Sequence, residues 1–552
     1  MGASLADQPG GGGRGRRWRR WAVLLAAVAL VVLLADCFDT NEVDKLPLAL
    51  QRVQPLWLPG DWYLNQPQPH QGLFLELTGR LVRQVGFGAG ALLIRLAGYG
   101  LWCAGALAVA EQLGLSLPWL LAGLALWLPR QGMVAGEWML GSAEPKTFAY
   151  ALLLLAFVSW RRGRPAWAGL MAGLAGSAHV LVGGYGALGL AGLALLQSGR
   201  SRWRWLARAL PTAALGAWAL YGPVLGRLRG LGPAGAPPPW GLSAAWLYGP
   251  FRHPHHLLPS SWGGGWLAAL AVLLAWGLLG RWLAVALPGP ALPANHRQAC
   301  RHLWLWAGLA LVPFGLGVLV SLLDPTGPLL QVYPFRLADT LVPLTVVLLG
   351  ARLLQALAAS RPGLVPLRRW GAGAVALVLA LAAVISSRGV VLRPWRAFAP
   401  PPEKAALYGA VLARTPAGGR VLTPPGGFSD LALRTGRAQV VQFRQVPASL
   451  ALLGDWARRL GALAGDGAVL GAGPGGAAAE RRLVAAYGQL PPQALAALAS
   501  RYGAVAVVTA AGQAGPPGWS AAVAGGPWQL WLPPPRQAGA TPRPADGAPA
   551  AP

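Results

Sequence analysis

The sequence is short of charged residues, of lysine and of acids, and these shortages narrow the class of protein. Charged residues make up 12% of the 552 positions, whereas soluble globular chains carry roughly 25%. An ordinary soluble domain is therefore excluded. Lysine occurs only at Lys45, Lys146 and Lys404, and Asp and Glu together number 18, so arginine carries the net charge of +28.

Hydrophobic residues are abundant instead, at 55% of the chain with a mean hydropathy of +0.45. They gather in runs of roughly 15 to 22 residues, a length that crosses about 30 Å of hydrocarbon. This pattern predicts a mainly α-helical, polytopic membrane protein with about eleven transmembrane helices. The predicted crossings are 21–35, 92–110, 115–128, 147–160, 166–182, 185–196, 206–225, 266–283, 303–323, 337–358 and 370–385.

The first run is interpreted as a retained anchor with the N-terminus in the cytoplasm. A cleaved signal peptide is the alternative, but Leu33, Leu34 and Ala35 lack small residues at the spacing that cleavage needs. Alternating the runs from a cytoplasmic start places every arginine-rich loop inside, which is the positive-inside pattern of a multi-pass inner (cell) membrane protein. The net charge is thus explained by topology, and we expect no nucleic-acid partner. Cys37, Cys103 and Cys300 fall outside, within a helix and inside, so no intramolecular disulfide is expected.

The same alternation sorts the acids, which were not used to set it. Among residues 36–386, Glu111 alone falls inside, and of the histidines only His296 and His302 do. The acids that fall outside or at outer helix ends are Asp36, Asp39, Glu42, Asp44, Asp61, Glu76, Glu137, Glu144, Asp324 and Asp339. Either inner loops simply avoid acids, or the outer face carries a functional site.

The stretch Asp36–Lys45 follows the first crossing and is the most acidic part of the outer face. Asp39 and Glu42 are three residues apart, so in a continuous helix they share a face and could act as general base and orienting group, or bind a divalent metal. A solvated helix end is the alternative. The next stretch, Leu46–Gly60, alternates apolar and polar residues and is expected to include a helix that lies in the membrane interface and holds a lipid-borne substrate.

The segment Gly141–Tyr150 carries a second acidic group. Pro145 suits the first turn of a helix, and Glu144 would then lie at the positive end of the helix dipole with Lys146 nearby. A simple helix cap would account for the same residues, so both interpretations stay open.

Two further outer segments carry cations. The first, Tyr248–Trp262, contains a dense group that could contact a phosphate or pyrophosphate, ligate a metal, or merely shape the loop; its members are Arg252, His253, His255 and His256. In the second, Gln331–Thr340, Arg336 lies three residues before Asp339. These two either form a structural pair, or Arg336 is a second phosphate contact.

Residues 387–532 change character and predict a small extracytoplasmic α/β domain. Short β-rich segments at 420–423, 438–443 and 504–510 alternate with helical patterns at 403–415, 449–463, 479–489 and 492–501. Gly471, Gly473 and Gly476 match GxGxxG before a helix, yet no acid follows about twenty residues on, so we do not expect a dinucleotide site. The basic N-terminal tail 1–20 and the Pro/Ala-rich tail 533–552 are expected to be disordered.

Taken together, an anchor helix with an acidic outer loop, GSAEPKTFAY, YPFRLADT, about eleven crossings and an outer C-terminal domain resemble the GT-C superfamily of integral-membrane glycosyltransferases. Residues 21–386 would be the transmembrane domain. The resemblance implies a sugar donor carried on polyprenyl phosphate, Asp39 or Glu42 as base, Glu144 with Lys146 as the second site, and Arg336 as a phosphate contact. The sequence departs from the superfamily in lacking an adjacent acidic pair in the first loop and in carrying HPHH.

A non-catalytic transporter or lipid-binding scaffold is the alternative function. A transporter should carry charges along a path through its helices. Arg95 is the clearest deeply placed charge, so a continuous polar path is not evident in the sequence.

Overall fold

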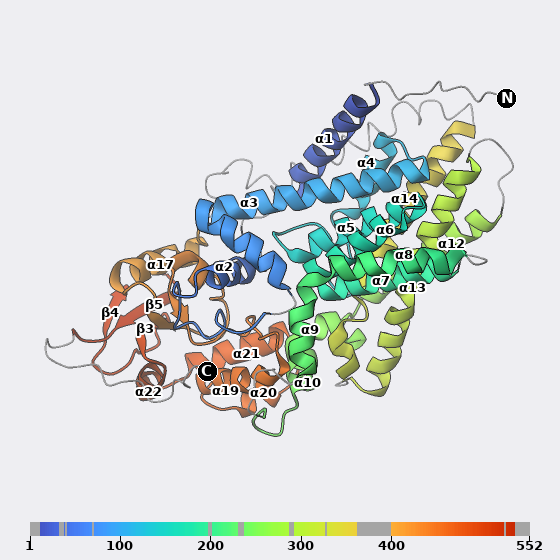
Figure 1. The fold of residues 1–552 in the computed structure, drawn as a ribbon. Coiled ribbons are helices and arrows are strands. Elements are labelled where there is room, and N and C mark those ends of the chain that lie inside the picture. The colour runs from blue at the N-terminus through green and yellow to red at the C-terminus, as the bar shows by residue number, and fades with distance from the viewer. Residues whose placement is uncertain are drawn as a thin grey trace, which may run out of the picture.

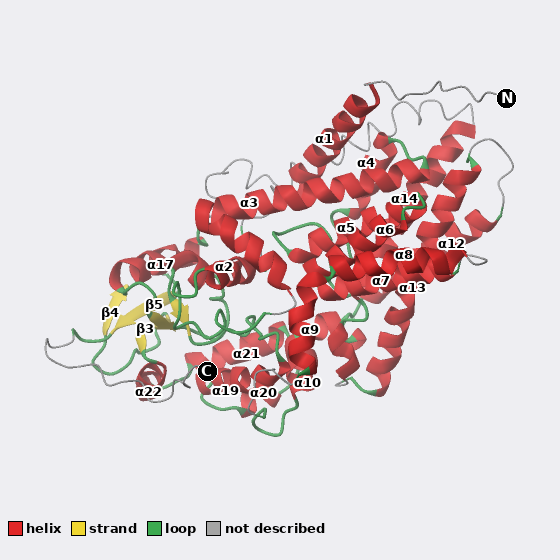
Figure 2. Ribbon diagram, in the orientation of Figure 1, coloured by secondary structure: helices red, strands yellow, loops and turns green. Residues whose placement is uncertain are grey.

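The computed structural model describes residues 12–32, 38, 41–68, 71–196, 201–229, 237–285, 292–325, 328–360, 399–523 and 526–535. Helices fill most of the molecule, and the strands gather in one small domain near the C-terminus (Figure 1, Figure 2). The expected mainly α fold with a small α/β domain is confirmed.

The helical part has helices at most of the predicted crossings that lie within the described residues. Its helices are α1 Gly12–Val32, α2 Glu42–Val53, α3 Gly72–Leu113, α4 Leu117–Trp127, α5 Pro145–Arg161, α6 Pro165–Ala178, α7 Val180–Leu195, α8 Ser201–Gly216, α9 Tyr221–Leu228, α10 Ala244–Trp246, α11 Pro254–Leu257, α12 Gly265–Ala284, α13 Ala294–Leu323 and α14 Arg336–Ser360. Short 3-10 turns, η2 Trp218–Leu220, η4 Pro259–Ser261 and η5 Pro328–Val332, and a π-helical turn, η3 Leu247–Arg252, join them.

The number of crossings is not confirmed. Within the described residues, α3, α12, α13 and α14 are long and apolar enough to span a membrane, and α4 and α7 are shorter apolar helices. The predicted crossing at 206–225 is divided between α8 and α9 by η2. The predicted crossing at 370–385 lies outside the described residues.

Helix α3 is two helices joined at Gly86, which has φ 80° and ψ 173°. Its first half packs on α2, and Gly79 makes this contact possible, because a Cβ there would lie 2.0 Å from the Ala49 carbonyl oxygen. In the stretch 46–60, where a helix is expected, the structure has the second part of α2, which begins at Glu42 and ends at Val53, two residues before Pro55. Its position in the membrane interface stays a prediction. Figure 1 shows α2 and the first half of α3 beside the C-terminal domain.

Helices α5 and α14 run between two chemically different ends of the helical part. At one end, Arg161 Nη1 lies 2.9 Å from His302 Nδ1, and Arg17 pairs with Glu111 at 3.2 Å. At the other end, α5 and α14 begin beside the acidic residues and the C-terminal domain. Glu111 and His302 thus lie near the C-terminal end of α5, and Glu137 and Glu144 near its start. Which end faces the cytoplasm stays a prediction.

The C-terminal domain holds a five-stranded sheet in the order β2-β1-β3-β5-β4. Its strands are β1 Arg420–Leu422, β2 Ala438–Gln439, β3 Ala504–Ala510, β4 Ser520–Val523 and β5 Trp528–Leu532, and its helices are α17 Pro402–Arg414, α18 Leu431–Thr435, α19 Leu453–Leu463, α20 Ala468–Gly471, α21 Ala477–Gly488 and α22 Pro492–Tyr502, with the 3-10 turn η9 Leu450–Leu452 before α19. Strands β1, β2 and β3 pair in parallel, and β5 pairs antiparallel with β3 and β4. The strand and helix segments expected before residue 511 are confirmed; β4 and β5 were not predicted.

Polar contacts dock this domain onto the helical part. Asp61, in the loop after α2, accepts hydrogen bonds from the backbone N–H groups of Leu64 and Gln439, both at 2.9 Å. Arg420 Nε donates to the Gly60 carbonyl at 3.0 Å. Because Gln439 and Arg420 lie on β2 and β1, the sheet edge is fixed directly to the loop that follows the acidic stretch.

Candidate functional site

The loop between α4 and α5, residues 129–144, is held in shape by one carboxylate from α14. Asp339 Oδ1 accepts from the N–H groups of Val134 at 2.7 Å and Ala135 at 2.9 Å, and Oδ2 accepts from the N–H of Glu137 at 3.0 Å. Asp339 therefore does not serve as the partner of Arg336 that the sequence left open. It fixes the backbone from which the Glu137 side chain projects.

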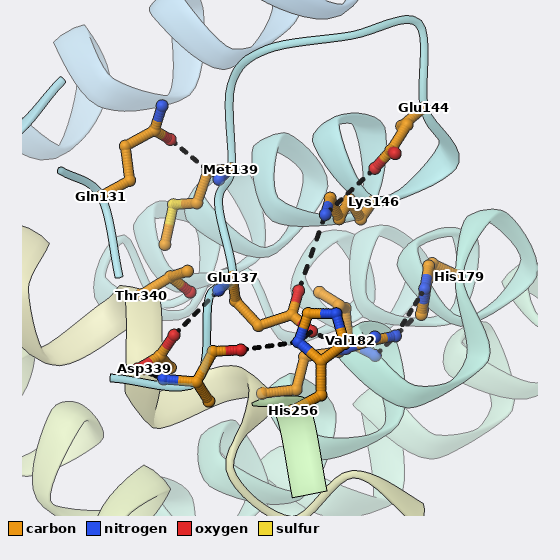
Figure 3. A network of polar contacts seen from close by, with 12 residues as sticks. Gln131, Glu137, Met139, Glu144, Lys146, His179, Val182, His256, Asp339 and Thr340 are labelled. Atoms are coloured by element: carbon orange, nitrogen blue, oxygen red, sulfur yellow. Dashed lines mark hydrogen bonds and ion pairs between the residues drawn. The ribbon is translucent and has the colours of Figure 1, made fainter. Parts of the chain in front are cut away.

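Glu137 is the centre of a buried charged network (Figure 3). Its Oε1 accepts from Arg336 Nε at 2.9 Å, its Oε2 lies 3.6 Å from Lys146 Nζ, and His256 Nδ1 lies 3.7 Å from Oε1. Burial alone would raise the pKa of Glu137, but Arg336 and Lys146 lower it to about 2. The side chain is thus an ionised carboxylate at any physiological pH.

The two cations beside Glu137 are themselves fully engaged. Lys146 Nζ lies 3.1 Å from Glu144 Oε2 and 3.3 Å above the ring of Trp138. Arg336 Nη1 lies 3.1 Å from His179 Nε2, and its guanidinium lies 4.2 Å from the centre of the Tyr333 ring. Glu144, Lys146 and Arg336, which the sequence grouped as candidates, therefore meet around Glu137.

The segment from η3 through α11, residues 247–257, is here called the His segment. His253 Nδ1 lies 2.9 Å from the Tyr248 carbonyl and His256 Nδ1 lies 2.6 Å from the Ala135 carbonyl. A carbonyl only accepts, so each Nδ1 carries the proton and each Nε2 keeps a lone pair. Burial lowers the pKa of His256 to about 3 and that of His253 well below its usual range. Both rings are neutral at physiological pH.

His255 is exposed, and its ring centre lies 4.0 Å from that of His256. It therefore sits at the edge of the same network. Within the part of the chain that the structure describes, no group of three or more His, Cys, Asp or Glu side chains has an arrangement that could hold a metal ion. The histidines contribute polar, uncharged groups here.

Two further cations lie close to this network without a carboxylate partner among the described residues. The side chain of Lys45, on α2, makes no hydrogen bond or ion pair with the described residues, and burial lowers its pKa although Asp44 and Glu144 act to raise it. Arg252 donates from Nη2 to the Arg444 carbonyl at 3.0 Å, while its Nε is buried without a partner. Burial lowers the pKa of Arg252 as well.

Asp44 lies between the helical part and the C-terminal domain. Its Oδ1 accepts from Gln445 Nε2 at 3.3 Å, and the residue is 8% exposed. Burial raises the pKa of Asp44 to about 6, although Lys45, the hydrogen bond from Gln445, and Arg252 oppose the shift. A carboxyl group with a pKa in this range can take up and release a proton near neutral pH.

Glu42, a candidate base, is fully buried and paired. Arg95 donates to both of its oxygens, from Nε to Oε1 at 2.6 Å and from Nη2 to Oε2, and the Ala143 N–H also donates to Oε1 at 2.6 Å. This arrangement ties the start of α2 to the 129–144 loop. Asp39, the other candidate base, lies outside the described residues.

The structure thus brings most candidate side chains into one region. Glu144, Lys146, Arg336 and His256 all connect through Glu137, with His255 next to His256, while Arg252 and His253 lie on the same His segment. Asp44, Lys45, Glu137 and His179 were not selected from the sequence as site residues. Asp44 and Lys45 belong to the acidic stretch, and Glu137 shares a loop with Glu144, so proximity in sequence was the available signal.

Comparison with known proteins gives matches among solved structures. No protein-family model and no curated protein matches the chain. The chain is similar to the arabinofuranosyltransferase AftD from Mycobacteria, with 16% identity and a TM-score of 0.46 over 94% of this chain, and it spans 40% of the length of AftD. It is also similar to ArnT from Cupriavidus metallidurans bound to undecaprenyl phosphate, with 12% identity and a TM-score of 0.45, covering 96% of this chain and 100% of that one. Both identities are below 25% and both TM-scores are below 0.5.

Proposed function

We propose that this chain is an integral-membrane glycosyltransferase that takes a sugar from a polyprenyl-phosphate donor at the outer face of the cell membrane. The observation that carries the proposal is that two cations, Lys45 and Arg252, share the neighbourhood of a single carboxyl group, Asp44, and that neither forms an ion pair within 4 Å among the described residues. A partly buried cation without a counter-ion costs free energy. An anionic ligand would supply the missing charge.

The surroundings favour a lipid-borne phosphate over a free anion. The apolar helices α12, α13 and α14 are long enough to span a membrane, and the cations lie at the end of the helical part where α14 begins. A polyprenyl chain would remain in the bilayer while its phosphate reached Lys45 and Arg252. Two cations stabilise the negative charge that grows on a departing phosphate, which lowers the barrier to transfer.

The transfer step needs a proton acceptor as well as cations. The acceptor hydroxyl oxygen attacks the anomeric carbon, the bond from that carbon to the phosphate oxygen breaks, and the phosphate leaves with the electron pair. The proton of the hydroxyl passes to a carboxylate. Asp39 and Glu42 are the bases that the superfamily resemblance implies. Among the described carboxylates, Asp44 has the best combination of position and pKa, since both oxygens of Glu42 are held by Arg95.

Under this proposal the network around Glu137 shapes the site. Glu144, Lys146 and Arg336 set its charge and geometry, while His253, His255 and His256 offer polar groups to the sugar or phosphate. Because Arg336 and Lys146 already neutralise Glu137 and Glu144, they stabilise a leaving phosphate less than Lys45 and Arg252 would.

Binding of undecaprenyl phosphate to the purified full chain tests the proposal. Lys45→Met and Arg252→Met should each weaken binding by about tenfold or more, as expected when a charge-assisted contact of roughly 1.5–3 kcal/mol is lost. Arg481→Met, which removes an exposed arginine of α21, should leave binding unchanged. Undecaprenol, which lacks the phosphate, should bind at least about tenfold more weakly than the phosphate.

Turnover completes the test. Given a polyprenyl-phosphate sugar with a radiolabel in the sugar and an acceptor with a free hydroxyl, the wild-type chain should move the label to the acceptor and release unlabelled polyprenyl phosphate, and Asp44→Asn should lose most of this activity. Equal affinity for undecaprenol and undecaprenyl phosphate would overturn the phosphate site. Phosphate-dependent binding with no release of polyprenyl phosphate from any donor tested would favour a lipid-binding scaffold.

A further inference from the structure

The glycine-rich stretch Gly471–Gly476 matches a nucleotide-binding pattern, yet the structure places it against the His segment. The Gly476 N–H donates to the Phe251 carbonyl at 2.7 Å. Gly475 approaches the same backbone so closely that a Cβ there would lie 1.9 Å from the Pro250 carbonyl oxygen and 2.7 Å from that of Phe251. The absence of side chains at these two positions is what allows the contact.

Residues of the glycine-rich stretch and of the His segment both contribute to this contact. Gly476 has φ +61°, a conformation that other residues rarely adopt. A Cβ at this position would lie 3.1 Å from the ring of Pro254. Phe251 is fully buried in the C-terminal domain, with its ring centre 5.3 Å from that of Phe443 and 5.9 Å from that of Trp456. An aromatic anchor and a backbone hydrogen bond together fix the His segment to the domain.

A second contact holds the chain just before the His segment. The ring of Trp240 covers Gly467, where a Cβ would lie 1.9 Å from the ring, and also Gly461, at 2.5 Å. The C-terminal domain therefore contacts residues 240–254 at two places. Arg252 of the His segment also donates to the Arg444 carbonyl of the domain. The other end of the His segment reaches into the charged network, where His256 Nδ1 donates to the Ala135 carbonyl.

We infer that Gly475 and Gly476 are positioning residues: they clamp the His segment so that the C-terminal domain sets where Arg252 and His256 lie, and through His256 the position of the 129–144 loop. The C-terminal domain then helps to position the residues of the site, and the glycines of the GxGxxG pattern make a contact within the chain. This inference concerns the geometry of the chain and goes beyond the proposed reaction.

Hydrogen–deuterium exchange of the full chain in detergent tests the clamp without reference to activity. Gly475→Ala should speed exchange by about tenfold or more in peptides that cover 248–258 and, at a distance, in those that cover 133–137. Gly471→Ala is the matched control, because Gly471 is exposed and a Cβ there meets nothing within 4 Å. Exchange in β3 reports in the same data whether the domain stays folded.

Phe251→Leu is a second, milder variant that tests the clamp from the opposite side if Gly475→Ala does not fold. It should give the same pattern, faster exchange at 248–258 and 133–137 with β3 protected. Unchanged exchange at 133–137, with faster exchange at 248–258, would overturn the inference that the clamp positions the loop. Unchanged exchange in both regions would overturn the clamp itself.

A last measurement uses lipid binding, and it is the only test of the clamp that rests on the proposed function. Gly475→Ala should weaken binding of undecaprenyl phosphate by about tenfold while Gly471→Ala leaves it unchanged. If the wild-type chain does not bind the lipid, the proposed function fails and the exchange results still decide the clamp. If it binds and Gly475→Ala binds equally well, the clamp does not set the position of Arg252.

Discussion

Arg336 donates from Nε to Oε1 of Glu137 at 2.9 Å, and the two residues are 199 positions apart in the sequence. The pair joins the start of α14 to the loop that precedes α5. Both side chains are largely removed from solvent, at 14% and 2% exposure. Such a pair is weakly stabilising as a whole, but the loss of one member leaves a buried charge uncompensated.

Glu137→Gln should therefore destabilise the chain by about 3–5 kcal/mol, the usual result of removing one member of a buried pair. Glu144→Gln removes a carboxylate that, among the described residues, forms an ion pair with Lys146 only, and it should cost clearly less. Equilibrium unfolding of both variants in detergent measures the difference. Equal loss in the two variants would contradict the central position of Glu137.

Arg95→Leu should destabilise the chain by about 3–5 kcal/mol as well, because Glu42 would be left buried without its partner. The double variant Glu42→Leu with Arg95→Leu should recover part of this loss, since an apolar pair replaces the charges. A double-mutant cycle from unfolding measurements gives the coupling. If the double variant is no more stable than Arg95→Leu, the two side chains are not coupled as the structure indicates.

The raised pKa of Asp44 predicts how the stability of the folded chain depends on pH. Its pKa is about 6 in the folded chain against an ordinary value of 3.8. The folded state therefore binds more protons between these values, and the free energy of unfolding falls as the pH rises from about 4 to 6. Asp44→Asn has no charge to bury. Above pH 6 it should be more stable than the wild type by roughly 1–3 kcal/mol, and below pH 4 the difference should vanish. Unfolding curves of both proteins across pH 4–8 test this.

Asp339→Asn should loosen the 129–144 loop. An amide has one oxygen, so its NH2 group would face either the Glu137 N–H or the N–H groups of Val134 and Ala135, which the carboxylate now satisfies. Leaving a buried donor unpaired costs about 1–3 kcal/mol. Hydrogen exchange at residues 133–137 should rise while α5 stays protected. Unchanged exchange there would show that Asp339 does not organise the loop.

The sequence predicted elements whose signals are local. Apolar runs marked helices within the described residues, and the helical pattern at 492–501 matches α22, which begins at Pro492 and ends before Gly503 with φ +61°. Strands β4 and β5 escaped prediction because their segments are short, and glycines and prolines separate them from β3. The number of crossings could not be obtained from run length alone, since α4 has only 11 residues.

The site was predictable by kind and place, but its pairings were not. The grouping of most acids and histidines on one side, opposite the arginine-rich loops, was predicted by alternating the apolar runs along the chain. The partner of each group depends on packing between segments 50 to 200 residues apart, as for Arg95 with Glu42, which are 53 positions apart. The role of Gly475 likewise depends on a backbone that approaches from another domain, which a local pattern does not encode.

The break at Gly86 has a consequence for how the polypeptide is accommodated in the bilayer. A straight rod of the 42 residues of α3 would measure about 63 Å, roughly twice the hydrocarbon thickness. Because the helix breaks at Gly86, the half that carries Arg80 and Arg83 can lie outside the apolar layer while the half that ends at Leu113 spans it. A single achiral residue thus determines how much of this helix the lipids must solvate. An alanine in its place would favour a straight helix and bring Arg80 and Arg83 closer to the hydrocarbon.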